Sequence, residues 1–265
     1  MLINTFCHLP RIGLNKEKTL WGKGIHSWDD YRKTAKNLDD LDESELHFKN
    51  RNAGYFSRSL KSDQQWRLFD DFRDSVAYID IETTGLDRSY NEITSIALYD
   101  GTDLRTYVSG QNLTQFPKDI QQYKVLVSYN GKMFDIPFIE RQFGIELDHA
   151  HIDLRFVLAK LGYKGGLKGV ERAMGIDRGD LDGVDGFFAV WLWGEYKKKK
   201  NEAALETLLA YNCTDVVNLE HLAVTAYNQN MKQTPFGSHR QAAAAKPVKI
   251  PFQADKKLVS RRSGW

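Results

Sequence analysis

The chain has 265 residues, of which 42% are hydrophobic and 27% charged, the composition of a globular protein with a sizeable core. No apolar run is long enough to span a membrane and the N-terminus lacks a signal-peptide pattern, so we expect a cytoplasmic protein. The two cysteines, Cys7 and Cys213, have no metal-ligand spacing and indicate a reducing compartment without a disulfide framework.

The net charge of +2 is unevenly distributed along the chain. Residues 231–265 contain eight Lys or Arg and one acid, a local charge of +7 that leaves −5 for the rest. This distribution is not typical of a protein that grips nucleic acid over its whole surface. It fits an acidic pocket that needs cations, with basic segments elsewhere.

The pattern predicts three regions: a polar, helical module over residues 1–64, a mixed strand and helix domain over 65–230, and a basic tail over 231–265. In the module, residues 9–16 resemble half of a helix-hairpin-helix element, which can present backbone N–H groups to a phosphate. Arg11 and Lys16 are therefore candidate nucleic-acid contacts, although a small packed helical module explains the pattern equally well. The tail lacks periodicity, and we expect it to be largely disordered.

The middle region begins with strand patterns and continues with helices, which favours an α/β fold with a mixed sheet flanked by helices. A short turn at Asp100-Gly101 joins the second and third predicted strands and implies antiparallel pairing. The predicted strands are 76–82, 92–99, 104–108 and 125–129, and the predicted helices are 137–143, 154–161, 167–174, 187–199 and 202–229.

The first predicted strand ends in Asp80-Ile81-Glu82. Side chains alternate along a strand, so Asp80 and Glu82 share one face, and Ile79 and Ile81 point to the other. Two neighbouring acids repel each other unless a cation or a proton relieves them. A solvated edge strand would also carry such acids, but the apolar flank at 76–79 indicates burial. The pair is a candidate metal site.

Two further acids belong to patterns that are ambiguous when each is taken alone. Asp135 lies just ahead of a predicted helix, where an acid is usually a cap, and Gly131 suits an ordinary turn or a close ligand approach. Tyr211 and Asp215 are four residues apart on a predicted helix and therefore share a face. In isolation, ordinary helix packing is the simpler interpretation of that pair.

The three motifs together resemble a known family. D-x-E-T-T-G at a strand end, N-G-x-x-F-D-x-P-F before a helix and Y-x-x-x-D on a late helix resemble the DEDD (proofreading-type) 3′→5′ exonuclease superfamily. The tyrosine spacing is typical of the DEDDy branch, because the histidine branch needs His where this chain has Ala210. The phrases at 165–168, 191–193 and 211–212 are similar to a prokaryotic group of ribonuclease-H-like exonuclease domain proteins.

The resemblance implies a ribonuclease-H-like mixed sheet and a site of Asp80, Glu82, Asp135, Tyr211 and Asp215. Four carboxylates in one pocket raise each other's pKa, and their hard oxygen ligands select Mg²⁺ or Mn²⁺. By analogy, two ions would be bound: Asp80 bridges them, Glu82 and Asp215 complete the nucleophile side, and Asp135 acts on the other ion through water. Tyr211 would orient the attacking water, since a phenol with a pKa near 10 is a poor base.

Other residues are candidates for substrate contact or for metal binding. Candidate substrate contacts are Thr83, Leu86, Asn130, Gly131, Lys164 and Lys168, of which the lysines flank a Gly-Gly turn that could equally be a simple helix connection. His149 and His151 lie near Asp153, but Asp153 fits a cap for the following helix, and we expect the histidines to end a strand without binding metal. Lys197–Lys200 fit a solvated helix end, and the tail could add non-specific affinity or have no role.

The sequence therefore favours a metal-dependent 3′→5′ exonuclease acting on single-stranded nucleic acid. The alternatives are a nucleic-acid-binding module with weak or lost catalysis, and a nuclease subunit of a repair or replication assembly. All five motif residues are present, which argues against lost catalysis. The hairpin-like N-terminus favours DNA over RNA, but no residue can be assigned to contact a 2′-hydroxyl group.

Overall fold

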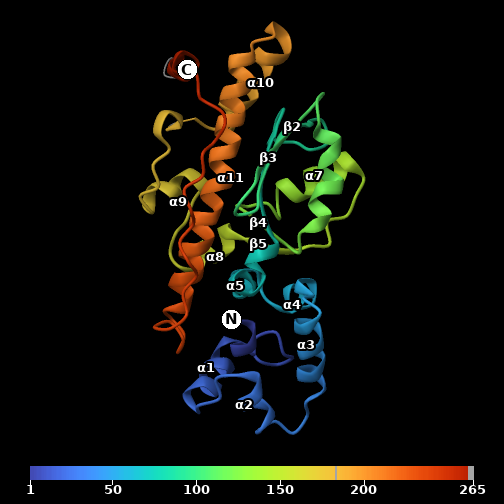
Figure 1. Cartoon of the computed structure of the whole chain (residues 1–265), viewed down its shortest axis with the longest axis vertical. Helices are drawn as coiled ribbons and strands as arrows, with labels where there is room; N and C mark the ends of the chain where they lie inside the picture. The colour runs from blue at the N-terminus through green and yellow to red at the C-terminus, as the bar shows by residue number, and fades with distance from the viewer. Residues whose placement is uncertain (183, 262–265) are drawn as a thin grey trace.

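The computed structural model describes residues 1–182 and 184–261, and a five-stranded sheet with the order β3-β2-β1-β4-β5 lies at its centre (Figure 1). β1 pairs antiparallel with β2 and β2 with β3, whereas β4 and β5 extend the sheet in parallel from β1. The mixed sheet flanked by helices confirms the predicted fold class. The strands are β1 (Val76–Thr83), β2 (Ile93–Tyr99), β3 (Leu104–Val108), β4 (Val125–Ser128) and β5 (Ala150–Asp153).

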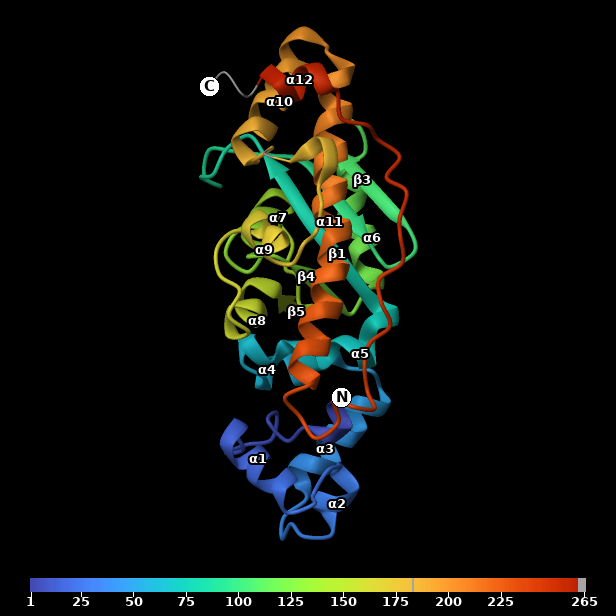
Figure 2. The ribbon, with the colours of Figure 1, turned by 90° about the vertical axis from the view of Figure 1, so that its left-hand side faces the viewer.

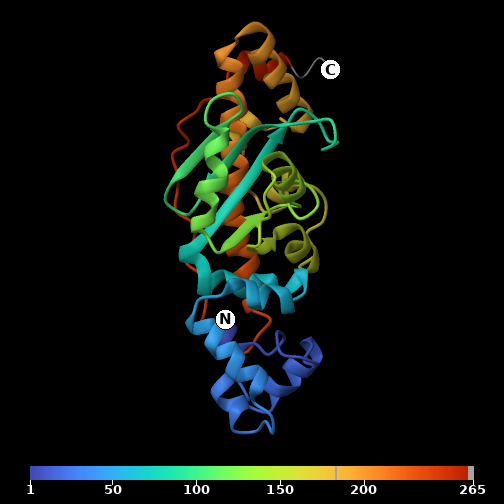
Figure 3. The ribbon, with the colours of Figure 1, turned by 90° about the vertical axis from the view of Figure 1, so that its right-hand side faces the viewer.

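The two faces of the sheet bury different side chains because residues alternate along each strand. Val76 and Tyr78 belong to the core that includes α11 (Glu202–Met231), and Ile79 and Ile81 belong to the core on the opposite face. α11 lies in front of the sheet in Figure 2, and the strands lie in front of α11 in Figure 3. Along the described chain, no helix is both long and apolar enough to cross a membrane.

The other helices of this region pack on one or the other face. α6 (Phe116–Asp119) and α7 (Asp135–Phe143) supply the core opposite α11, and α10 (Gly186–Lys199) packs along the N-terminal half of α11. Asp153 caps α8 (Leu154–Lys160) by accepting the N–H of Arg155 at 3.1 Å, as predicted. The remaining segments are α9 (Leu167–Ala173), η4 (Leu113–Gln115), η5 (Ile120–Gln122) and η6 (Gly179–Leu181).

The N-terminal region is helical but does not form a helix-hairpin-helix pair. The turn at residues 9–13 leads into α1 (Leu14–Gly22), but only the short 3-10 turn η1 (Leu2–Asn4) precedes it. The predicted hairpin therefore has no first α-helix. The expected boundary at residue 64 falls inside η2 (Ser62–Leu68). The other segments are α2 (Trp28–Arg32), α3 (Asp39–Lys49), α4 (Ala53–Ser59), α5 (Phe69–Phe72) and η3 (Arg73–Ser75).

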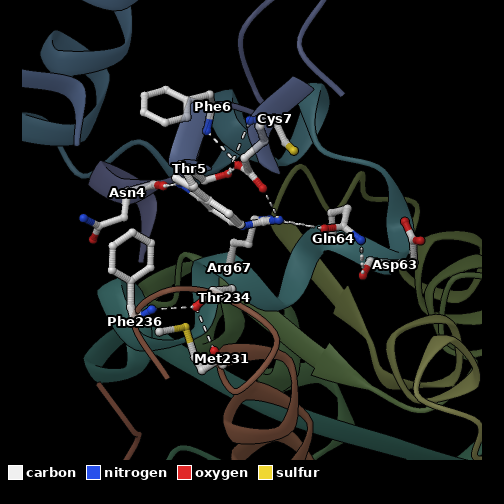
Figure 4. A network of polar contacts seen from close by, with 12 residues as sticks. Asn4, Thr5, Phe6, Cys7, Asp63, Gln64, Arg67, Met231, Thr234 and Phe236 are labelled. Atoms are coloured by element: carbon white, nitrogen blue, oxygen red, sulfur yellow. Dashed lines mark hydrogen bonds and ion pairs between the residues drawn. The ribbon is translucent and has the colours of Figure 1, made fainter. Parts of the chain in front are cut away.

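A buried ion pair joins this helical region to η2 (Figure 4). Arg67 of η2 is 2.7 Å from Glu17 of α1, and the two side chains are 2% and 0% exposed. The other oxygen of Glu17 accepts the hydroxyl of Thr5 at 2.5 Å and the N–H of Phe6 at 2.9 Å. Gln64 accepts from Arg67, whose guanidinium lies 4.7 Å from the Trp66 ring centroid. A buried charge needs this degree of pairing.

The basic tail packs against the surface of the preceding domain, which differs from the expected disorder. It runs back along α11 from the helical region to the far end of the molecule (Figures 1 and 2). Ala242 exchanges hydrogen bonds with the side chain of Asn228, and the N–H of Asp255 donates to Thr207 at 3.0 Å. The tail ends in α12 (Lys256–Ser260). Scattered apolar residues pack this extended segment, including Phe236, Val248, Ile250, Phe252 and Leu258.

Candidate active site

The C-terminal end of β1 presents two carboxylates on the face that α11 covers. Asp80 and Glu82 alternate with Ile79 and Ile81, which are buried in the opposite core. A β-bulge interrupts the pairing of β1 with β2 between Glu82 and Thr83. Bulges re-aim the side chains beside them and are frequent next to functional sites.

α11 brings Tyr211 and Asp215 to the same place, one helical turn apart. Asn212 fixes the helix to the strand, because its amide nitrogen donates to Asp80 Oδ2 at 2.7 Å and to the Asp80 carbonyl at 3.1 Å. The amide oxygen of Asn212 accepts the hydroxyl of Ser95 in β2 at 3.0 Å. This role of Asn212 was not predicted from the sequence, although the residue directly follows Tyr211.

Three carboxylates converge at this point. Asp80, Glu82 and Asp215 each offer one oxygen, and these oxygens lie within 4.8 Å of one another. Carboxylate oxygens are hard ligands, and a cluster of them without sulfur or imidazole suits Mg²⁺ or Mn²⁺ better than softer metals. The donor set therefore fits the cations that the sequence predicts.

Asp135 approaches the same cluster from α7. It lies in the first turn of the helix, where Phe134 is the N-cap residue. Its Oδ1 accepts the backbone N–H of Ile81 at 3.2 Å, so the carboxylate is tied to β1 between Asp80 and Glu82. The side chain is buried, and it lines the same cavity as the other three acids.

The loop before α7 is held by Asp153 at the end of β5. The two carboxylate oxygens of Asp153 accept the N–H groups of Asn130 and Lys132, at 2.8 and 3.1 Å. Gly131 lies between them, where an added Cβ would come within 2.1 Å of the Ser128 hydroxyl oxygen. This position therefore requires glycine for close packing against β4.

Burial and mutual repulsion raise the pKa of the acids. Loss of solvent is the largest cause for Asp80, followed by the charges of Asp215 and Glu82, and its pKa lies well above the ordinary range. Burial and then the charge of Asp215 likewise raise the pKa of Glu82 well above its ordinary value. Burial raises the pKa of Asp135 to about 7. The cluster therefore carries its full charge at neutral pH only when cations relieve it.

Two protein cations already lie against the cluster. Lys168 of α9 donates to the phenol oxygen of Tyr211, and its nitrogen lies 4.3 Å from the ring centroid. Burial lowers the pKa of Lys168. Arg178 donates to Asp215 Oδ1 and lies 5.4 Å over the ring of Tyr211. Lys168 was predicted only as a substrate contact, and Arg178 was not predicted to belong to the site.

The site opens into a cavity of about 1070 Å³. Leu86 and Phe187 line it and are 74% and 78% exposed, so apolar surface lies beside the acids. Phe187 is absent from the predicted contacts, since an aromatic residue at a helix start is usually ascribed to packing. The predicted contacts that line the cavity are Thr83, Leu86, Asn130, Lys164 and Lys168.

Three of the predicted substrate contacts do not line this cavity. Gly131 packs against Ser128, and Arg11 and Lys16 are exposed in the helical region. The histidines also have protein partners. His151 shares a hydrogen bond of 2.7 Å with the Ser128 hydroxyl, and His149 contacts the Ile120 carbonyl at 3.1 Å.

The sequence of the middle region matches a known protein family. Residues 77–227 match a family (RNase_H_2) of the RNase_H superfamily. Among curated proteins, no sequence matches this chain.

Two solved structures are similar to parts of the chain. The family B DNA polymerase of Pyrobaculum calidifontis is 16% identical, with a TM-score of 0.44 over 59% of this chain and 24% of the polymerase. The matched region thus spans about a quarter of the polymerase chain. NrnC of Brucella melitensis, solved with bound Mg²⁺, is 19% identical, with a TM-score of 0.42 over 62% of this chain and 77% of its own. On the family match, which covers more than half of its residues, the chain belongs to the RNase_H superfamily.

Proposed function

We propose that this protein is a metal-dependent 3′→5′ exonuclease of the DEDDy type that hydrolyses phosphodiester bonds of single-stranded nucleic acid. One observation carries the proposal: Asp80, Glu82 and Asp215 converge within 4.8 Å in a large cavity, with Asp135 beside them. Such a concentration of buried acids is costly for stability and is explained by cations that the protein binds. The direction of attack and the number of ions, two, rest on the motif resemblance.

Mg²⁺ or Mn²⁺ ions held by these carboxylates would activate a water molecule and stabilise the departing oxygen. The protein supplies the geometry. Asn212 holds Asp80 and the N–H of Ile81 holds Asp135, so the three motifs are fixed relative to one another before any ligand binds. Preorganised groups lose little entropy during the reaction.

Tyr211 acts by orientation in this proposal. Burial is the largest cause that raises the pKa of its phenol, followed by the charges of Asp215 and Glu82, so it stays protonated. Lys168 already donates to the phenol oxygen, which leaves the phenol hydrogen to donate into the cavity. A water molecule accepting that hydrogen would be aligned for attack.

The cavity wall suits the end of an unpaired strand. Leu86 and Phe187 offer apolar surface on which a splayed base can stack, and base–aromatic stacking is worth roughly 1–3 kcal/mol. Arg155 and Lys164 supply positive charge to the same wall, where phosphates would lie. We propose DNA as the preferred substrate, with RNA as the alternative outcome of the test.

The test uses single-stranded DNA and RNA labelled at either end, incubated with the protein and Mg²⁺ or Mn²⁺. Stepwise shortening from the 3′ end is expected, with no cleavage in EDTA and none by Asp80→Asn, which preserves shape and removes one charge. Internal cuts would contradict the direction. Cleavage by Asp80→Asn at the wild-type rate would refute the assignment of the site.

A binding module with lost catalysis gives a different result in the same experiment. Such a protein would retain the labelled strands in a filter-binding assay with Ca²⁺ and would leave them intact with Mg²⁺ and Mn²⁺. A duplex with a blunt end serves as the matched substrate, because it presents the same phosphates without an unpaired base. Equal cleavage of the duplex would contradict the preference for single strands.

A further inference from the structure

Arg178 lies in an exposed turn after α9, but its side chain is buried in the protein interior. Asp177 and Gly179 are exposed on either side of Arg178, yet the side chain of Arg178 is only 4% exposed. The turn is held by the hydrogen bond from the Gly179 N–H to Asp177 Oδ1 at 2.9 Å. Burying a guanidinium is costly, so the contacts that it makes inside must compensate.

Arg178 bridges two carboxylates that differ in their access to the site. Its Nη1 lies 2.7 Å from Glu171 Oε2, and its Nη2 donates to Asp215 Oδ1. Glu171 is fully buried, and its other oxygen accepts the amide of Asn218 at 2.8 Å. Glu171 and Asn218 therefore hold the guanidinium in place, and the guanidinium in turn fixes one oxygen of Asp215.

Arg178 lies behind the active site and not in it. It is absent from the residues that line the large cavity, and instead it lines a second cavity of about 460 Å³, which shares Lys168 and Asp185 with the first. A substrate in the large cavity would meet Asp215 and Tyr211 without touching Arg178. Arg178 can therefore act on the reaction through the residues that it contacts and through its charge, which lowers the pKa of Glu82.

We propose that Arg178, anchored by Glu171, is the positioning residue of the metal site: it engages one oxygen of Asp215 so that the other faces Asp80 and Glu82. Its guanidinium also packs 5.4 Å over Tyr211, so one side chain sets two functional groups on α11. The inference rests on the proposed function in taking these acids as metal ligands. Partners that orient metal ligands typically change metal affinity by about 10–100-fold when removed.

The charge-conserving double variant Arg178→Gln with Glu171→Gln tests this arrangement. It removes one positive and one negative charge together, so the summed charge near the acids is kept and the amides can still hydrogen-bond. The matched control is Arg172→Gln with Asp182→Asn, because that pair spans 3.7 Å on the same segment but is 76% and 69% exposed.

The primary measurement is the affinity for Mn²⁺ alone, by isothermal titration calorimetry. We expect roughly 10–100-fold weaker binding in the Arg178/Glu171 variant and unchanged binding in the Arg172/Asp182 control. In cleavage assays, kcat should fall with KM for the strand within about twofold, because Arg178 does not touch the substrate. Unchanged Mn²⁺ affinity in the double variant would overturn the inference.

The variant Arg178→Lys distinguishes the bridging contact to Glu171 and Asp215 from the effect of the positive charge alone. Lysine keeps the positive charge, but its ammonium group cannot bridge two carboxylates as the planar guanidinium does. We therefore expect about tenfold weaker Mn²⁺ binding. Full Mn²⁺ affinity in this variant would show that charge alone suffices, which would also overturn the inference. If the wild type binds Mn²⁺ but cleaves nothing, the nuclease proposal fails, and calorimetry still decides the role of Arg178.

Discussion

Among the residues that the structure describes, two buried arginine–carboxylate networks differ in their balance of positive and negative charge. At the junction between α1 and η2, one arginine, Arg67, meets one acid, Glu17, and neutral donors satisfy the remaining oxygen. At the end of β1, two cations, Lys168 and Arg178, meet five acids, which are Asp80, Glu82, Asp135, Glu171 and Asp215. The junction pairs one positive with one negative charge, whereas the acids at the site outnumber the cations.

This difference separates a structural role from a functional one. A balanced buried pair fixes how two parts of the chain pack, and removing one partner leaves a lone buried charge. An unbalanced cluster lowers the stability of the metal-free protein and creates affinity for cations. Variants at the junction should therefore change stability with or without metal, and variants at the site should change metal binding and rate.

The largest expected effect is at the junction. Arg67→Met leaves Glu17 without a cation at 0% exposure, which should cost about 3–5 kcal/mol of unfolding free energy. The melting temperature should fall by about 10 °C, equally in EDTA and in Mn²⁺. Arg32→Met is the control, because its pairs with Asp42 and Glu45 are exposed to solvent, which screens them, and the variant should unfold at nearly the wild-type temperature. An equal loss in both variants would remove the distinction between buried and exposed pairs.

Tyr211→Phe should lower the rate of cleavage and leave the Mn²⁺ affinity unchanged. Without the phenol the attacking water loses its alignment, and we expect kcat to fall about a hundredfold, equivalent to about 2.7 kcal/mol. Calorimetry should find the Mn²⁺ affinity unchanged within about twofold, because the phenol is not proposed as a ligand. Tyr107→Phe, which loses a 3.0 Å hydrogen bond to Asp119 far along the sheet, is the control and should keep the full rate. A loss of Mn²⁺ affinity in Tyr211→Phe would contradict the positioning role.

The smallest effect is a pH dependence confined to the site. The folded pKa of Asp135 is raised to about 7, and the pKa values of Asp80 and Glu82 lie well above their ordinary values, so the folded protein keeps protons that the unfolded chain has released. The corresponding stability is present at low pH and is lost as pH rises through the folded pKa values. Above the ordinary carboxylate pKa of about 4, the metal-free melting temperature should therefore fall with rising pH by a few degrees relative to Asp80→Asn.

Two other groups make this comparison necessary. Burial lowers the pKa of His8 and His151 to about 3, so these histidines add stability as pH rises to about 6.5, and their effect cancels against the Asp80→Asn control. Saturating Mn²⁺ should abolish the difference between wild type and variant slopes, because ion binding requires deprotonated carboxylates. If the melting temperatures of wild type and Asp80→Asn depend on pH equally without metal, the pKa of Asp80 is not raised in the folded protein.

Local periodicity was sufficient to predict much of the fold. The 104–108 strand has the predicted ends, and the 76–82 strand differs from β1 by one residue, because an alternating buried strand is specified by its own sequence. The same alternation placed Asp80 and Glu82 on one face. The helical period placed Tyr211 and Asp215 together, because residues four apart share a face.

Contacts between distant segments were beyond such patterns. Nothing in the sequence near Arg178 indicates that an exposed turn sends it to Asp215, 37 positions away. The bond from Ile81 to Asp135 likewise exists only because β1 and α7 meet in three dimensions. The tail has no periodicity, since an extended segment needs only scattered apolar residues that match the surface beneath it.

The path of the tail has a consequence for the order in which the site is completed during synthesis. α12 packs its Leu258 into the core that holds Leu181 and Phe188, and Lys256 lies 3.1 Å from Asp180, two residues beyond Arg178. These supports are translated after every acid of the site, Asp215 included. When α11 has just left the ribosome, the nascent chain therefore contains all the acids of the site but not α12, which packs beside the turn that contains Arg178. The segment around residue 258 can dock beside this turn only after all the acids of the site have been translated.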